Sequence, residues 1–166
     1  MLSYVLFYSA ALVSVVATIM VIVSLNAVHA LLYVILSFLA LSIVFYLMGA
    51  FYAAMLQIIV HVGAIMMLFL FVVMMLNLGL RTLEQERKWL SPAAWRWPSA
   101  MAAVLLTELV FVLMQEKPAA LGHIVASKEV GIHLLGPYVL AVELASMLLL
   151  VGLVGAYHLT RREEKT

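Results

Sequence analysis

The chain has 166 residues, of which 67% are hydrophobic and 10% are charged, with a mean hydropathy of +1.21 and a formal net charge of +1. A soluble domain of this size could not bury so much apolar surface, so the composition indicates a polytopic membrane protein. Cys and Asp are absent, which excludes disulfides, thiolate chemistry and cysteine-held metal or iron–sulfur centres on this chain.

Five apolar stretches predict an all-α fold with five transmembrane helices, packed as a single membrane domain over residues 1–166. We expect the spans at about 2–23, 28–48, 50–78, 99–114 and 137–159. The first stretch lacks the basic region and the cleavage site of a secretory signal, and we interpret it as a retained helix. Between the third and fourth spans lies a polar, tryptophan-rich connector, residues 79–98, and residues 115–134 are predicted as a second loop.

The distribution of the basic residues predicts the orientation in the membrane. The connector holds four Lys and Arg residues and the C-terminal tail holds three, whereas the loop before the fifth span holds two. Because cytoplasmic loops are enriched in Lys and Arg, we expect the connector and the C-terminus in the cytoplasm and the N-terminus outside.

The third apolar stretch, residues 50–78, contains no charged residue and is unusually long. As a helix it would span roughly 43 Å, against a hydrocarbon core of about 30 Å. It contains Gln57, His61 one turn later, and Gly63, none of which a simple lipid anchor requires. A glycine near the middle of a span is a candidate weak point in the helix. His61 is either a neutral group hydrogen-bonded to Gln57 or a proton carrier, because its unperturbed pKa lies near 6.5.

Two glutamates lie within the later spans. Glu143 is placed in the outer third of its span, where it is either an interfacial carboxylate or a protonatable station in a proton path. Glu108 lies about ten residues into its span, and we interpret it as a structural glutamate that is protonated or paired across a subunit interface. The five histidines show no metal-ligand spacing, and no phosphate loop, nucleophile triad or dinucleotide motif is present.

The chain is therefore not a self-contained enzyme. Two classes of function remain open from the residues alone, a subunit of an ion-translocating membrane complex and a structural or assembly protein of the membrane. A charge-free first half suits either, since helices buried among other subunits need no charge.

Four segments in order resemble the J subunit family of bacterial NADH:quinone oxidoreductase, respiratory complex I, which includes the mitochondrial sixth NADH dehydrogenase subunit. They are NAVHALLYVILS (Asn26–Ser37), IIVHVGAIMMLFLFVVMMLNLG (Ile58–Gly79), QERKWL (Gln85–Leu90) and GPYVLAVELASMLLLVGLV (Gly136–Val154). The resemblance is collinear and extends over almost the whole chain.

The resemblance implies a membrane-arm subunit of the bacterial inner membrane that carries no redox cofactor. The complex holds FMN, iron–sulfur clusters and quinone on other subunits. The implied partners are the K, H, A and N subunits and membrane lipids, with no nucleic acid. The family is known for a π-bulge in its third helix, whose conversion to α-helix gates a water path. Here the bulge is expected around His61 and Gly63, with the downstream aromatic residue at Phe69.

Two residues depart from the family pattern. The usual tyrosine is His61, and a glutamate of many bacterial members is Gln57. A carboxylate at position 57 is therefore not part of proton transfer in this chain, whereas His61 can still donate one hydrogen bond and accept another. We predict that the third helix couples quinone reduction to proton translocation by changing shape, with Gln57, His61, Gly63, Phe69 and Glu143 as the gating and proton-path residues. The alternatives are an assembly subunit and a subunit of a related cation antiporter or membrane hydrogenase.

Overall fold

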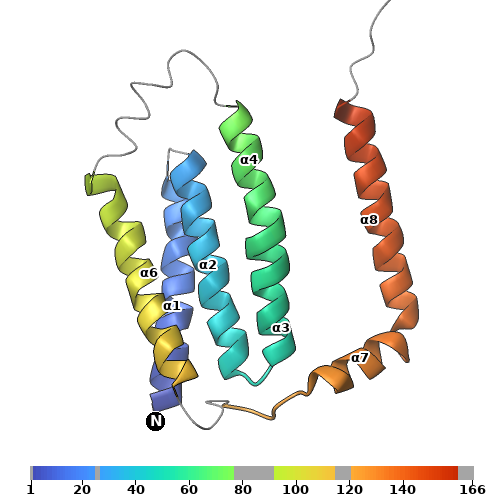
Figure 1. Ribbon diagram of the computed structural model, residues 1–166, viewed down its shortest axis with the longest axis horizontal. Helices are drawn as coiled ribbons and strands as arrows, with labels where there is room; N and C mark the ends of the chain where they lie inside the picture. The colour runs from blue at the N-terminus through green and yellow to red at the C-terminus, as the bar shows by residue number, and fades with distance from the viewer. Residues whose placement is uncertain (1, 25–26, 77–91, 115–120, 161–166) are drawn as a thin grey trace, which may run out of the picture. The chain divides into compact units, whose positions relative to one another are not determined.

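The computed structural model describes residues 2–24, 27–76, 92–114 and 121–160 (Figure 1). The regular elements in these ranges are all helices, and five of them are long and apolar enough to cross a membrane, which confirms the predicted fold class. The five candidate spans are Ser3–Val23, Ala27–Leu47, Phe51–Met75, Trp95–Leu113 and Val139–Leu159. The chain divides between Val125 and Ala126 into two compact units. The orientation of the termini and the single membrane domain stay predictions.

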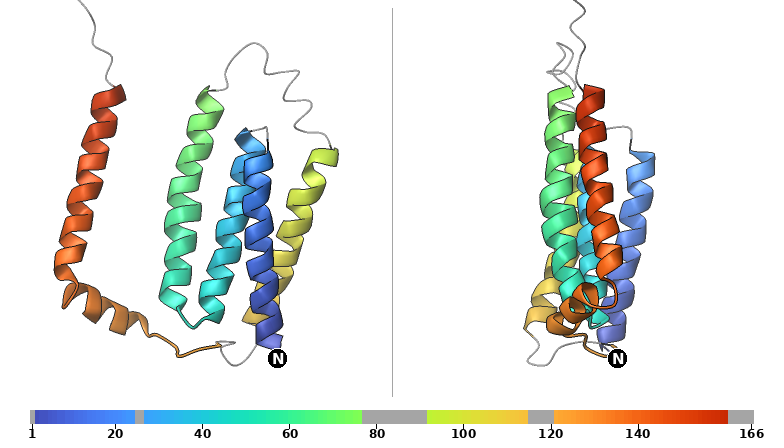
Figure 2. Two further views of the ribbon diagram at one scale, coloured as in Figure 1. Left: turned by 180° about the vertical axis from the view of Figure 1, so that it is seen from behind. Right: turned by 90° about the vertical axis from the view of Figure 1, so that its right-hand side faces the viewer.

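The first unit is a helical bundle with α2 at its centre (Figures 1 and 2). Helix α2 contacts α1, α6 and all three parts of the third helix. The bounds are Leu2–Val23 for α1, Ala27–Leu47 for α2, Phe51–Leu56 for α3, Gln57–Met66 for the π-helix η1, Met67–Leu76 for α4 and Pro92–Leu113 for α6. The third predicted span is thus one continuous helix with a change of hydrogen-bond pattern inside it.

Small side chains let the helices of this bundle approach closely. Ala10, Ala17 and Ala40 are fully buried where α1 meets α2. The Ser37 hydroxyl lies 3.2 Å from the Ser14 hydroxyl and 2.9 Å from the Thr18 hydroxyl, so hydrogen bonds join the same two helices. Close packing and polar contacts of this kind hold helices together in lipid, where the hydrophobic effect between helices is weak.

A tight turn at Gly49 joins α2 to the third helix. Gly49 has a φ of +89°, and a Cβ there would lie 2.7 Å from the carbonyl oxygen of His123. The backbone N–H of Val125 donates to the Gly49 carbonyl at 3.2 Å, so the chain after α6 packs directly on this turn. Both the dihedral angle and the close approach require glycine.

Helix α6 begins at Pro92, seven residues before the predicted fourth span. Pro92 is the first residue of the helix, where its missing N–H costs nothing. Pro98 lies inside the helix instead of ending the connector. The Ser99 hydroxyl donates to the carbonyls of Trp95 at 2.7 Å and Arg96 at 3.1 Å within the same helix.

The second unit consists of α7, Ser127–Leu135, and α8, Val139–Thr160. Helix α7 corrects the prediction of a loop over residues 115–134. Glu129 in its first turn and His133 in its last turn suit the helix dipole, and this local signal was available in the sequence. A turn at Gly136–Tyr138 follows, so α8 begins two residues after the predicted start at Pro137.

Several predictions lie outside the described residues. These are the connector up to residue 91, the helix end at residues 77–79 and the charged C-terminal tail.

Candidate functional site

The most unusual feature of the first unit is the π-helix in the middle of the third span. Its ten residues, Gln57–Met66, lie between two α-helical segments and have the sequence QIIVHVGAIM. Most π-helices are single-turn bulges, so a run of this length is uncommon, and such segments occur frequently at functional sites. The predicted π-bulge in the third helix is confirmed, and it extends over more residues than the stretch around His61 and Gly63.

The π segment contains both polar residues expected there, and they differ in exposure. The Gln57 side chain is 8% exposed, where the segment begins, whereas His61 is exposed. The His61 ring makes a T-shaped contact with the Phe38 ring on α2, with ring centroids 5.5 Å apart and planes at 61°. His61 is thus placed by an aromatic neighbour on α2, a contact that the spacing of Gln57 and His61 did not predict.

A residue of α2 holds the start of the π segment. The Ser42 side chain is buried and donates a hydrogen bond to the carbonyl of Ala54 at 3.1 Å. The same carbonyl also accepts from the backbone N–H of Gln57, three residues later. A carbonyl at the junction of two hydrogen-bond patterns is therefore supported from the neighbouring helix, as expected where a membrane helix departs from the regular α pattern. Sequence reasoning missed Ser42, because nothing in the spacing of α2 indicates which backbone carbonyl it faces.

We expect Ser42→Ala to loosen this junction. The substitution removes the interhelical hydrogen bond, and such bonds average about 0.6 kcal/mol in membrane proteins. Amide hydrogen exchange around residues 54–58 in the purified complex should accelerate by about threefold, which corresponds to that free energy. Ser9→Ala is the matched control, because the Ser9 hydroxyl donates, among the described residues, to the carbonyls of Val5 and Leu6 in its own helix. Unchanged exchange in Ser42→Ala would contradict the assigned role.

Gly63 and Phe69 lie on either side of the end of the π segment. Gly63 is exposed, and a Cβ built on it would lie 3.4 Å from the carbonyl oxygen of Ile58, an ordinary van der Waals contact. The present conformation therefore accepts a side chain at this position, and any requirement for glycine must come from another conformation or from a neighbouring subunit. Phe69 is 52% exposed and belongs to α4, beyond the π segment.

Glu143 belongs to the second unit, where it lies on α8. It is exposed in the second turn of α8, and the Ser146 hydroxyl donates to its backbone carbonyl at 2.7 Å. Gln57, His61 and Gly63 thus lie together in the π segment of the first unit. Glu143 lies on a helix of the second unit. Among the described residues, no group of three or more acidic or histidine side chains could hold a metal ion.

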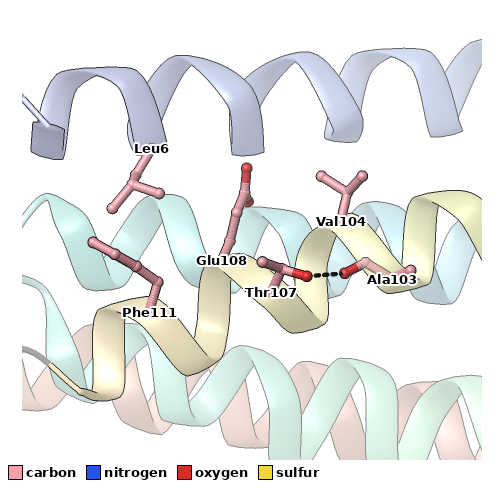
Figure 3. Close-up of a pocket in the computed structure, with 6 residues that line it drawn as sticks. All are labelled: Leu6, Ala103, Val104, Thr107, Glu108 and Phe111. Carbon is pink, nitrogen blue, oxygen red and sulfur yellow. Dashed lines mark hydrogen bonds between the residues drawn. The ribbon is translucent and has the colours of Figure 1, made fainter.

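A second polar feature lies on α6, where Glu108 is 6% exposed. Its Oε2 atom is buried and accepts no hydrogen bond from any described residue. Such an unpaired buried group costs about 1–3 kcal/mol, and more if it is charged. Glu108 lies on the same face of α6 as Leu105 and Val112, which are also buried. The spacing of these three residues in the sequence could therefore have indicated that the carboxyl faces the bundle. Figure 3 shows its side chain pointing from α6 toward α1.

Comparisons with known proteins identify relatives over nearly the whole chain. Residues 17–159 match the family described as NADH-ubiquinone/plastoquinone oxidoreductase chain 6. A protein of Pseudomonas aeruginosa named NADH-quinone oxidoreductase subunit J is 59% identical over 161 residues, which are 96% of this chain and 97% of the relative. Proteins of the same name from Escherichia coli and Rhodobacter capsulatus are 52% and 39% identical, over 95% and 94% of this chain and 86% and 80% of the relatives.

Proposed function

Because the chain belongs to the NADH-ubiquinone/plastoquinone oxidoreductase chain 6 family, we propose that it acts as subunit J of a proton-pumping NADH:quinone oxidoreductase. Its five candidate spans suit a multi-pass subunit of the membrane arm. The redox groups, FMN, iron–sulfur clusters and quinone, are bound by other subunits. The chain contributes to the reaction by coupling and transfers no electrons itself.

The coupling step is a change of hydrogen-bond pattern in the third helix. The observation that carries this proposal is the ten-residue π-helix between α3 and α4. Conversion of i→i+5 to i→i+4 bonding lengthens the converted segment and rotates the helix beyond it, so one end moves relative to the other. His61 lies within the segment, can exchange hydrogen bonds with water, and would change its position during the conversion.

The setting of the chain in the complex follows from the same proposal. The K, H, A and N subunits are its neighbours, and the bacterial inner membrane is its location. The connector and the C-terminus lie in the cytoplasm, because they hold seven of the nine Lys and Arg residues. In this arrangement Glu143 lies in the part of α8 that is nearer the outer side of the membrane.

A strain that lacks the chain, complemented with a tagged copy, tests the proposal. The tagged chain should co-purify with an assembly that oxidises NADH, and its loss should abolish NADH-driven proton pumping in membrane vesicles. Co-purification with a cation antiporter or a hydrogenase would contradict the proposal. A native gel distinguishes a coupling role from an assembly role. If the chain acts only in assembly, every variant that lowers pumping will also lower the amount of intact complex.

A further inference from the structure

Residues 121–125, which follow α6 in the chain, form a strap across the turn between α2 and α3. The backbone N–H of Leu121 donates to the Leu47 carbonyl at 2.6 Å. The backbone N–H of Val125 donates to the Gly49 carbonyl at 3.2 Å. Both bonds join main-chain atoms, so the strap holds the turn through the backbone and not through side chains.

Glycines allow the strap and the turn to lie in close contact. A Cβ on Gly49 would lie 2.7 Å from the carbonyl oxygen of His123 in the strap. A Cβ on Gly122 would lie 3.3 Å from the carbonyl oxygen of Met48 in the turn, which is a tight approach. Each of the two segments therefore contributes a glycine where the other backbone comes near.

Two further contacts hold the beginning of the third helix to α2. The rings of Tyr46 and Phe51 lie 4.6 Å apart between centroids, across the same turn. The Ser42 hydroxyl donates to the Ala54 carbonyl at 3.1 Å, just before the π segment. The strap, the ring contact and this hydrogen bond all act on the helix before the π segment begins.

The other end of the third helix, α4, is held less firmly. It packs on α2, but no hydrogen bond between described residues joins it to α1, α2 or α6. Its Met74 and Met75 side chains are 59% and 69% exposed. The end of α4 lies at the opposite end of the bundle from the turn that the strap crosses (Figures 1 and 2). A change of helical pattern between these two ends therefore moves α4 more easily than α3.

We infer that the strap fixes the beginning of the third helix, so that a change of hydrogen-bond pattern in the π segment displaces α4 while α3 stays in place. Leu121 and Val125 are then positioning residues for coupling. This inference rests on the proposed function, because it gives the direction of the same conversion. Without the strap, the turn at Gly49 yields, and less of the movement reaches α4.

Proline at position 125 tests the strap. Val125→Pro removes the N–H that donates to the Gly49 carbonyl. In the assembled complex, amide exchange over residues 49–54 should accelerate by about fivefold, the change expected for one backbone hydrogen bond. The ratio of protons pumped to NADH oxidised should fall in the same preparation. Unchanged exchange, or a wild-type ratio despite faster exchange, would overturn the inference.

Ala126→Pro is the matched control for this variant. Ala126 has a φ of −70°, which proline accepts, and its N–H is not one of the two that donate to the turn. Exchange over residues 49–54 and the proton ratio should both stay at the wild-type level. A fall in the proton ratio equal to that of Val125→Pro would mean that the lost hydrogen bond is not the cause, which also overturns the inference.

A cross-link across the turn keeps the inference testable if Val125→Pro does not assemble. Tyr46→Cys and Phe51→Cys place a thiol pair where the two rings meet, and a cleavable cross-linker there should leave pumping unchanged, because this end stays in place. Lower pumping that cleavage restores would overturn the inference. The same cross-linker between Phe38→Cys and His61→Cys should lower pumping. Unchanged pumping with that second cross-link would contradict the proposed conversion itself.

Discussion

Gly63→Leu is expected to lower proton pumping by about tenfold in the assembled complex, a change equivalent to about 1.4 kcal/mol in the barrier. The residue lies exposed within the π segment, and the present conformation leaves room for a Cβ. When the segment rewinds to i→i+4 bonding, the residues around position 63 rotate, and a leucine side chain must then pass neighbouring groups. Pumping is measured as NADH-driven acidification in vesicles, and NADH oxidation is measured separately in the same preparation.

Two variants define what the Gly63 result means. Gly63→Ala adds only the Cβ, which would lie 3.4 Å from the Ile58 carbonyl oxygen, so we expect nearly normal pumping. Gly152→Leu places the same bulk on α8, where a Cβ has nothing within 4 Å among the described residues, and it should have little effect. Wild-type pumping in Gly63→Leu, with the complex intact on a native gel, would mean that the segment does not need to rewind during turnover.

Glu143→Gln is expected to lower pumping by about threefold or more, while the complex remains assembled. The amide keeps the size of the side chain but cannot release or take up a proton. Glu143 lies in the second turn of α8, in the outer third of the predicted span, and ionisable residues within membrane spans commonly mark proton paths. The measurement is the ratio of protons pumped to NADH oxidised in sealed vesicles.

Glu143→Asp provides the comparison for this prediction. It retains a titratable group on a shorter side chain, and we expect it to recover most of the pumping that Glu143→Gln loses. If both variants pump like the wild type, Glu143 is a structural group of α8. If both lose pumping together with assembled complex, the residue acts in assembly.

The third helix illustrates what the sequence alone could predict. Its length, its lack of charge and Gly63 predicted a defect, and the family resemblance predicted that the defect was a π-bulge. The extent of the π segment was not predictable, because it depends on how the helix is held by its neighbour. The Ser42 hydrogen bond to Ala54 is such a contact, and it joins residues of two helices across the interface.

Glu108 on α6 and His61 in the third helix also show where prediction from the sequence ends. Leu105, Glu108 and Val112 have helical spacing in the sequence, which places them on one face. Helix α1 carries no charged residue and only scattered hydroxyl groups, so its sequence does not indicate which face packs against Glu108. Likewise, Gln57 lies one turn before His61, but the ring contact of His61 is with Phe38 of α2. Contacts between helices are set by packing, which a single sequence does not specify.

The most direct test of the account restrains the π segment against α2. Phe38→Cys and His61→Cys introduce a thiol pair where the two rings meet, 5.5 Å between centroids, in a chain that has no cysteine of its own. A short cross-linker attached through disulfides joins the two positions and can be cleaved by reductant, and Phe38→Cys alone is the control for modification. The account predicts that cross-linking lowers NADH-driven proton pumping by about tenfold and that cleavage restores it. Equal pumping before and after cross-linking, with the cross-link verified by mass spectrometry, would contradict a movable third helix.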